Sequence, residues 1–220
     1  MLYVLPSSSV QSNIVGTLEG HDAKFNNFIQ LNQKRKEILG YFNLTCPCIS
    51  LWRRFKNRFW DHLQYWVLPK SVKEHIKVRS IVLSPAFGIL SVEDTIPRYS
   101  LTWNHFYKGV RLKEYWKKDI REITKVFFES MNVLLFVGKS EMPLVDTSRA
   151  KNVVIFEYYR KDKKVKNPLP HRAYTLRYIA ERGIDMDGLY RINFYNYSVY
   201  NIVQKDKLIR VVLKSPGEYI

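Results

Sequence analysis

Residues 111–138, RLKEYWKKDIREITKVFFESMNVLLFVG, decide the fold class because they join a helix pattern to a strand pattern. Over 111–129, apolar side chains recur every three or four residues, which is the period of an amphipathic helix. Residues 133–137 are continuously apolar and Gly138 follows them, as expected for a strand buried on both faces. The stretch therefore predicts a helix that leads into an interior strand of a sheet.

Further helix and strand patterns alternate along the rest of the chain. Strand-like apolar or β-rich runs occupy 2–5, 153–159 and 190–213, with a hairpin turn expected at 205–207. Helical patterns cover 23–42, 51–66 and 171–182. No internal repeat or long linker separates them. The sequence therefore predicts an α/β (mixed α+β) fold in a single domain over 1–220, with a mixed sheet flanked by helices.

The loop after the first strand has two interpretations. Pro6 ends the strand at 2–5, and three serines follow at 7–9. Their hydroxyl groups and open backbone amides are suited to an anion, whereas the simpler interpretation is an ordinary connecting loop.

The charge balance indicates the class of partner. The chain has 36 Lys and Arg against 20 Asp and Glu, a formal net charge of +16. Such a surplus attracts polyanions, so nucleic acid is the first candidate partner, DNA more than RNA, and an anionic membrane surface is only the second candidate. The chain has no run of eighteen apolar residues and no signal-like start, so we expect a cytoplasmic protein with no membrane partner.

Three cation-rich segments are candidates for phosphate contact. They are a basic aromatic helix at 51–66, the helix at 111–129, and the window 160–177, whose basic loop spans 160–170. The simpler interpretation of the first two segments is a solvated helix face that binds nothing, and for the third a solvated hairpin tip is an equal alternative. The residues expected to contact nucleic acid are Arg53, Arg54, Arg58, Lys113, Lys117, Arg121, Lys125, Lys163, Lys164, Lys166, Arg172 and Arg177.

An enzyme would need an acid or base in a cleft, and the candidates are Glu93, Asp94, Asp146 and His171. None has a spacing that requires catalysis, and Ser91 with Asp94 matches a capping box more simply. The patterns of a P-loop, a nucleophile elbow and a zinc protease are missing. Cys46 and Cys48 have no second pair of Cys or His at zinc-ligand spacing. We predict neither a metal nor a cofactor.

Residues 83–101, LSPAFGILSVEDTIPRYSL, with LKEYWKKDI at 112–120, resemble the central signature of the YaaA-type peroxide-stress family. MLYVLPSSS at the start, LVDTSRA at 144–150 and HRAYTLRYIAERGIDMDGLYRINF at 171–194 are similar to other elements of that family, so the resemblance covers most of the chain. The sequence also departs from the pattern. Ser100 stands where the family has Arg, with Arg98 in front of Tyr99 instead.

The resemblance implies a YaaA-like α/β architecture with a basic cleft for double-stranded nucleic acid and a link to oxidative stress. It also implies that a glycine hairpin contacts the phosphate backbone, and this role falls here to Gly88, with Arg98 and Tyr99 nearby. We therefore expect a nucleic-acid-binding protein rather than an enzyme. The alternatives are an enzyme acting on a nucleobase or nucleotide, whose basic surface holds its substrate, and a basic subunit that docks on an acidic protein.

Overall fold

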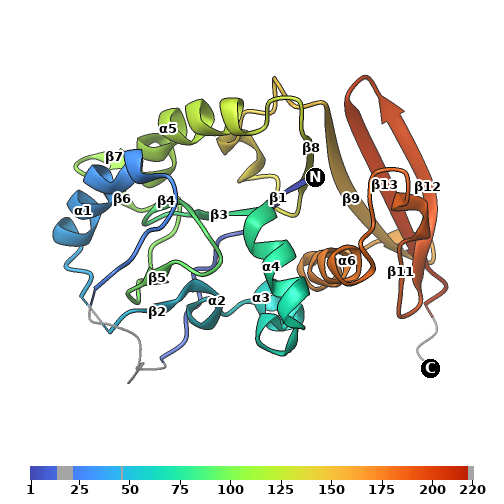
Figure 1. Cartoon of the computed structure of the whole chain (residues 1–220), viewed down its shortest axis with the longest axis horizontal. Helices are drawn as coiled ribbons and strands as arrows, with labels where there is room; N and C mark the ends of the chain where they lie inside the picture. Colours follow the sequence, from blue (N-terminus) through green and yellow to red (C-terminus); the bar gives the residue numbers. More distant parts are fainter. Residues whose placement is uncertain (14–21, 46, 218–220) are drawn as a thin grey trace.

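The protein is described here by a computed structural model for residues 1–13, 22–45 and 47–217, and its centre is a nine-stranded mixed sheet (Figure 1). The strands of this sheet are β1 (Leu2–Leu5), β3 (Ser80–Ser84), β4 (Gly88–Leu90), β8 (Asn132–Leu135), β9 (Asn152–Arg160), β10 (Lys163–Lys164), β11 (Asn193–Phe194), β12 (Tyr197–Lys205) and β13 (Leu208–Ser215). Two small two-stranded sheets pair β2 (Ile49–Ser50) with β5 (Thr95–Ile96), and β6 (Phe106–Tyr107) with β7 (Val110–Arg111).

The helices are α1 (Asn32–Tyr41), α2 (Leu51–Arg54), α3 (Arg58–Leu63), α4 (Lys70–Arg79), α5 (Leu112–Phe127) and α6 (Leu169–Arg182). Short 3₁₀ turns are η1 (Ile29–Leu31), η2 (Tyr65–Val67), η3 (Met142–Leu144) and η4 (Leu189–Arg191). The mixed α/β fold predicted from the sequence is confirmed. No helix in the described ranges is both long and apolar enough to cross a bilayer.

Five parallel strands form the core of the large sheet in the spatial order β3-β1-β8-β9-β13. Numbered along the chain, this order is second, first, third, fourth, fifth, as in one group of doubly wound α/β proteins. From β1 the chain moves to one side to form β3, and it then returns past β1 to form β8. The reversal places a topological switch point between β1 and β8, where the loops that leave the two strands diverge.

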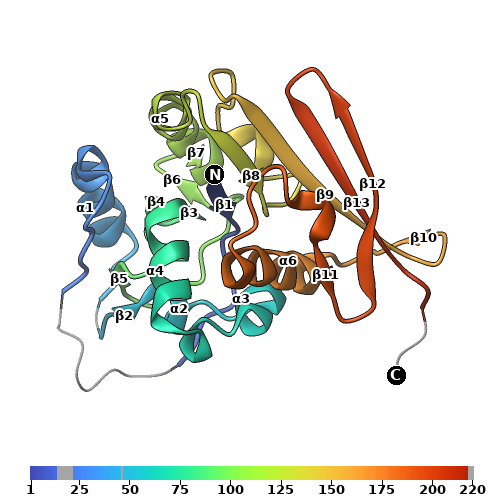
Figure 2. The same ribbon diagram turned by 45° about the vertical axis from the view of Figure 1, so that its right-hand side comes forward.

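The helices cover the two faces of the sheet unequally (Figures 1 and 2). Helix α5 lies on one face, and its own side chains Leu112, Trp116 and Ile120 are fully buried against the sheet. Helices α3, α4 and α6 lie on the other face, where α6 packs against α3 and beside β9, β13 and β12. Among the described residues, the α5 side of β9, β13 and β12 has no helix over it.

The stretch around Gly88 folds as a β-hairpin that a buried arginine holds in place. Strands β3 and β4 pair antiparallel, and Gly88 opens β4 opposite Ser84. The Arg35 side chain is fully buried and donates hydrogen bonds to the carbonyls of Phe87 and Ile89. The predicted capping box is a turn without a helix: Asp94 Oδ2 accepts the Ser91 N–H at 2.8 Å, and β5 follows.

Other expected boundaries also shift in the structure. The single helix expected over 51–66 is divided into α2 and α3, because Phe55 is extended and Asn57 caps a new helix. The helix expected from residue 23 begins at Ile29 as a 3₁₀ turn. Helix α6 starts at Leu169, before the predicted start, because a proline is tolerated in the first turn of a helix. The hairpin turn expected at 205–207 is confirmed between β12 and β13.

Candidate ligand-binding site

A cavity of about 810 Å³ lies at the switch point beyond the carboxyl ends of β1 and β8. Strand β8 pairs with β9 only as far as Leu135 opposite Ile155, whereas β9 continues to Arg160. Farther along the same edge of β9, β10 pairs with its last residues. The cavity therefore occupies the space between the end of β8 and the β10 hairpin, in the position where doubly wound sheets bind ligands.

A buried carboxylate fixes the floor of this cavity. Glu141 is 7% exposed, and its Oε1 atom accepts hydrogen bonds from Ser7 N at 3.2 Å, Ser7 Oγ at 2.5 Å and Trp103 Nε1 at 3.0 Å. The bonds from Ser7 join the loop after β8 to the loop after β1, and the bond from Trp103 adds the segment between β5 and β6. Because Oε1 is saturated, Oε2 is the carboxylate atom available to a ligand.

Hydrogen bonds from α3 and its N-cap residue fix the loop after β1. Asn57 Nδ2 donates to the Ser7 carbonyl at 3.0 Å, and Trp60 Nε1 donates to the Pro6 carbonyl at 3.2 Å. Ser8 is buried and its hydroxyl donates to the carbonyls of Val10 and Lys56. The serine loop is thus a rigid part of the cavity wall, and the hydroxyl of Ser8 is occupied.

The loop after β8 offers backbone donors. Its turn closes when Glu141 N and Met142 N both donate to the Gly138 carbonyl at 3.0 Å. The N–H groups of Lys139 and Ser140 have no hydrogen-bond partner within the described residues, and both residues line the cavity. Successive free amides of this kind attract anions.

Cations outnumber acids in the cavity lining. This lining includes Lys139, Lys164, Lys166 and Arg172, against the acids Glu141 and Glu157. Lys164 is paired with Glu157 at 2.9 Å. Arg172 lies in the first turn of α6, and its Nε atom is buried without a hydrogen-bond partner among the described residues. Burial lowers the pKa of Arg172, and the nearby Tyr158 and Glu141 oppose that shift.

The remaining walls are apolar or aromatic. They are formed mainly by Trp103, Met142, Phe156, Tyr158 and Leu169. A cavity with a carboxylate, free backbone amides, an arginine that lacks a hydrogen-bond partner at Nε, and aromatic walls fits a ligand with an anionic group and a flat ring. In the described part of the chain, no group of three or more His, Cys, Asp or Glu side chains is arranged to hold a metal ion.

The four expected catalytic residues do not come together. Asp94 is fully buried under the β4–β5 turn, where it accepts the N–H groups of Asn26 and Ser91. Glu93 pairs with Lys77 on the surface. Neither residue lines the cavity. Asp94 stabilises a turn, and Glu93 forms a surface ion pair.

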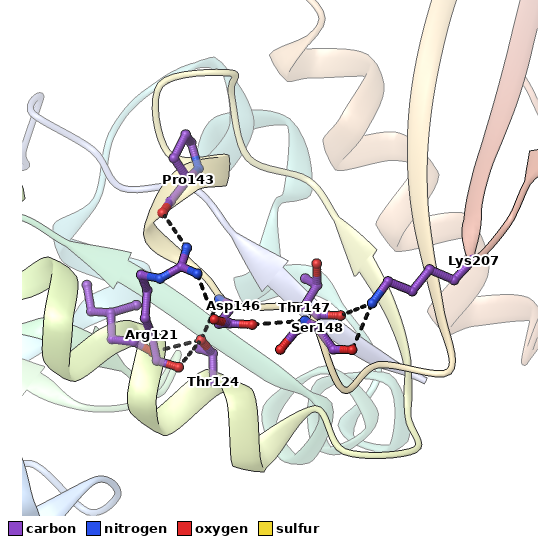
Figure 3. Close-up of polar contacts among 8 residues, drawn as sticks. Arg121, Thr124, Pro143, Asp146, Thr147, Ser148 and Lys207 are labelled. Atoms are coloured by element: carbon purple, nitrogen blue, oxygen red, sulfur yellow. Dashed lines mark hydrogen bonds and ion pairs between the residues drawn. The ribbon is translucent and has the colours of Figure 1, made fainter.

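Asp146 anchors a loop to α5 (Figure 3). Its carboxylate accepts a hydrogen bond from Arg121 Nη2 at 2.7 Å and from Ser148 N at 2.9 Å, and its N–H donates to Thr124 Oγ1. Lys207 donates to the carbonyls of the same loop, at Thr147 and Ser148. Asp146 and Arg121 therefore have a structural role: they attach the loop at 146–148 to α5.

His171 lies on α6 between aromatic rings. Its ring centroid is 5.3 Å from that of Tyr158 and 4.6 Å from that of Tyr197. Burial, then the charges of Arg160 and His62, lowers the pKa of His171 to about 4, so the side chain is neutral at pH 7. It is absent from the cavity lining, although Arg172 beside it is present.

The residues expected to contact nucleic acid are distributed over several surfaces. Lys113, Lys117, Arg121 and Lys125 lie on α5, across the sheet from Arg58 and Arg177 on α3 and α6. Lys163, Lys164 and Lys166 lie on the β10 hairpin beside the cavity. Arg98 is exposed and Arg53 half-buried, outside the cavity lining.

Three of the expected contact residues are buried and are corrections. Arg54 is 1% exposed and donates to the carbonyls of Ser12 and Pro47. Gly88 is covered by Trp116, and the Tyr99 hydroxyl is hydrogen-bonded to Ser84 Oγ at 2.9 Å. Their groups stabilise the fold and do not reach a phosphate.

The central residues Glu141, Trp103 and Ser140 were not predicted from the sequence. The available signal was a short polar segment, Gly138-Lys139-Ser140-Glu141, directly after a buried strand. The serines at 7–9 gave the matching signal after the first strand. No protein-family model and no curated protein sequence matches this chain, so the resemblance to the YaaA-type family stays a prediction.

Proposed function

We propose that the switch-point cavity binds a nucleoside phosphate, which corresponds to the nucleotide alternative of the sequence-based analysis. One observation carries this proposal: Glu141, whose carboxylate is hydrogen-bonded to the β1 loop, lines the same cavity as Arg172, whose buried Nε atom has no hydrogen-bond partner among the described residues. An acceptor and a cation in one cavity suit a ligand that carries both hydroxyl groups and an anion.

The parts of the cavity correspond to the parts of a nucleotide. Arg172 and the free amides of Lys139 and Ser140 are donors for a phosphate. Glu141 Oε2 is an acceptor for the hydroxyl groups of a sugar. Trp103 and Phe156 supply apolar surface for a base. The volume of about 810 Å³ is within the range of small-molecule sites.

Calorimetric titration with the common nucleoside monophosphates and the matching nucleosides tests this proposal. Removing the phosphate from the ligand should weaken binding to the wild-type protein by about 10- to 100-fold, the expected effect of losing charged hydrogen bonds. In Arg172→Gln this difference between nucleotide and nucleoside should largely disappear. Lys117→Gln on α5 is the matched control and should bind like the wild type. A wild-type protein that binds no nucleotide, or binds nucleosides equally well, contradicts the proposal.

We also propose, as a second function, that the protein binds nucleic acid through backbone contacts. The supporting observations are the net charge of +16 and the exposed lysines of the β10 hairpin beside the cavity. Because the cations are divided between two faces of the sheet, a single nucleic-acid strand cannot contact all of them along one surface. The proposed nucleic-acid-binding surface therefore includes the β10 hairpin and excludes α5.

A further inference from the structure

The open face of β9, β13 and β12 contains a second hollow of about 400 Å³. Along β13, Ile209, Val211 and Leu213 are buried toward α6, so the alternating residues Arg210 and Lys214 lie on the opposite face. Figures 1 and 2 show that no helix among the described residues covers this face. It is therefore a platform made from the surface of a sheet.

Two tyrosines stand on this platform. Tyr159 of β9 is opposite Lys214 of β13 in the strand register, and Tyr200 of β12 is 68% exposed. The Nζ atom of Lys214 lies 5.0 Å from the centroid of the Tyr200 ring. Because the tyrosines stand on strands two apart, their backbones are separated by about 10 Å. This separation suits a segment of about two or three nucleotides whose bases stack on aromatic rings of a sheet.

Cations and exposed ion pairs surround the tyrosines. Lys161, Arg210 and Lys214 line the hollow together with Glu157 and Asp162. Lys214 pairs with Asp162 at 2.8 Å, and Asp162 is 92% exposed. Exposed pairs of this kind contribute little stability, so a phosphate can replace the carboxylate as the partner of the lysine at low cost.

The platform adjoins the switch-point cavity. Glu157 lines both hollows, and the hairpin after β9 borders both, with Lys161 at the platform and Lys164 and Lys166 at the cavity. The Nζ atom of Lys164 lies 5.7 Å from the centroid of the Tyr159 ring, so the cavity and the platform meet at this lysine.

We propose that the open face of β9, β13 and β12 binds single-stranded nucleic acid whose terminal nucleotide enters the switch-point cavity. The placement of the terminal nucleotide rests on the proposed nucleotide site, whereas the binding of the strand rests on the platform itself. A single strand is required because bases that stack on Tyr159 and Tyr200 must be free of a complementary strand. The lysines and Arg210 then contact phosphates, as in other single-strand grooves.

The test is fluorescence anisotropy with labelled hexanucleotides of thymidine and uridine, and competition by the corresponding monophosphates. The hexanucleotide should bind at least tenfold more tightly than the mononucleotide. Tyr200→Ala should weaken hexanucleotide binding by about tenfold and leave mononucleotide binding unchanged. Tyr200→Phe keeps the ring and should bind like the wild type. Tyr190→Ala is the matched control, because Tyr190 is 65% exposed and lines neither hollow.

The outcomes separate the two proposals. If the mononucleotide binds but the hexanucleotide gains nothing, or if Tyr200→Ala changes neither, the platform is overturned and the nucleotide site stands. If the hexanucleotide binds in a Tyr200-dependent way and the mononucleotide does not bind, the nucleotide site and the placement of the terminal nucleotide are overturned, and the platform stands. Tighter binding of a duplex than of the single strand also overturns the platform.

Discussion

Gly88 is required by the fold, because its backbone has φ +74° and a Cβ atom there would lie 2.9 Å from Cε3 of Trp116. A side chain would meet both backbone strain and a clash with a fully buried ring. Gly88→Ala should therefore lower the free energy of unfolding by about 2 to 4 kcal/mol in denaturant titrations. The role in phosphate contact that the resemblance implies makes the opposite prediction: unchanged stability with weaker binding to nucleic acid.

Asp146 should make stability depend on pH. Hydrogen bonds from Ser148, then the charges of Arg121 and Lys125, lower the pKa of Asp146 below its ordinary value. The contacts of the ionised carboxylate therefore stabilise the folded state above about pH 4, and this contribution is lost as the pH falls through the lower pKa of the folded state. Asp146→Asn should lower the free energy of unfolding by about 1 kcal/mol at pH 7, with the difference from the wild type vanishing at acidic pH.

Thermal and denaturant unfolding between pH 2 and pH 7 measure this effect. Asp162→Asn is the control, because Asp162 also has a lowered pKa and an ion pair but lies at an exposed hairpin tip. Because solvent screens this exposed ion pair, Asp162→Asn should change stability much less than Asp146→Asn at every pH. A catalytic role for Asp146 would instead leave the stability of Asp146→Asn unchanged.

Helix α3 is linked to the cavity by its N-cap residue, Asn57. Its Oδ1 accepts the N–H groups of Phe59 and Trp60, and its Nδ2 holds the Ser7 carbonyl. Asn57→Ala should lower the free energy of unfolding by about 1 kcal/mol and weaken nucleotide binding, because the cap and the bond to the loop are both lost. Asn57→Asp keeps the cap and removes the donor.

Unfolding and nucleotide titration of both variants distinguish these contributions. Asn57→Asp should retain most of the helix stability and still bind nucleotide more weakly than the wild type. If both variants bind nucleotide with wild-type affinity, the position of the β1 loop is unimportant for the cavity.

The elements best predicted from the sequence are those with a local pattern. Helix α5, strand β8 and the β12–β13 hairpin each show their period or turn residues within a few positions. The helix expected over 51–66 failed because its apolar period continues through Asn57, while the capping bonds of that residue break the helix. Glu141 was missed for a different reason: its partner Ser7 is 134 residues away, and the parallel pairing of β1 with β8 brings them together.

For the whole molecule, the arrangement of charge matters more than its amount. A net charge of +16 predicts attraction to polyanions wherever the cations lie. The fold places the α5 cations across the sheet from α3 and α6, and it pairs several of them with acids, such as Lys117 with Glu114 and Arg121 with Asp146. The sequence shows three basic segments, but only the topology shows that they belong to different surfaces.

The salt dependence of binding tests which surface carries nucleic acid. Replacing Lys163, Lys164 and Lys166 of the β10 hairpin with Gln should reduce the log-log salt slope by about 2 for a single strand, since each phosphate contact contributes about 0.7, and by somewhat more for a duplex, at about 0.9 each. Replacing Lys113, Lys117 and Lys125 of α5 removes the same charge from the other face of the sheet and should leave the slope nearly unchanged. Filter binding at four salt concentrations measures both variants. An equal loss of slope in the two variants would show that the net charge, rather than the hairpin surface, determines binding, and the proposed track beside the cavity would then be wrong.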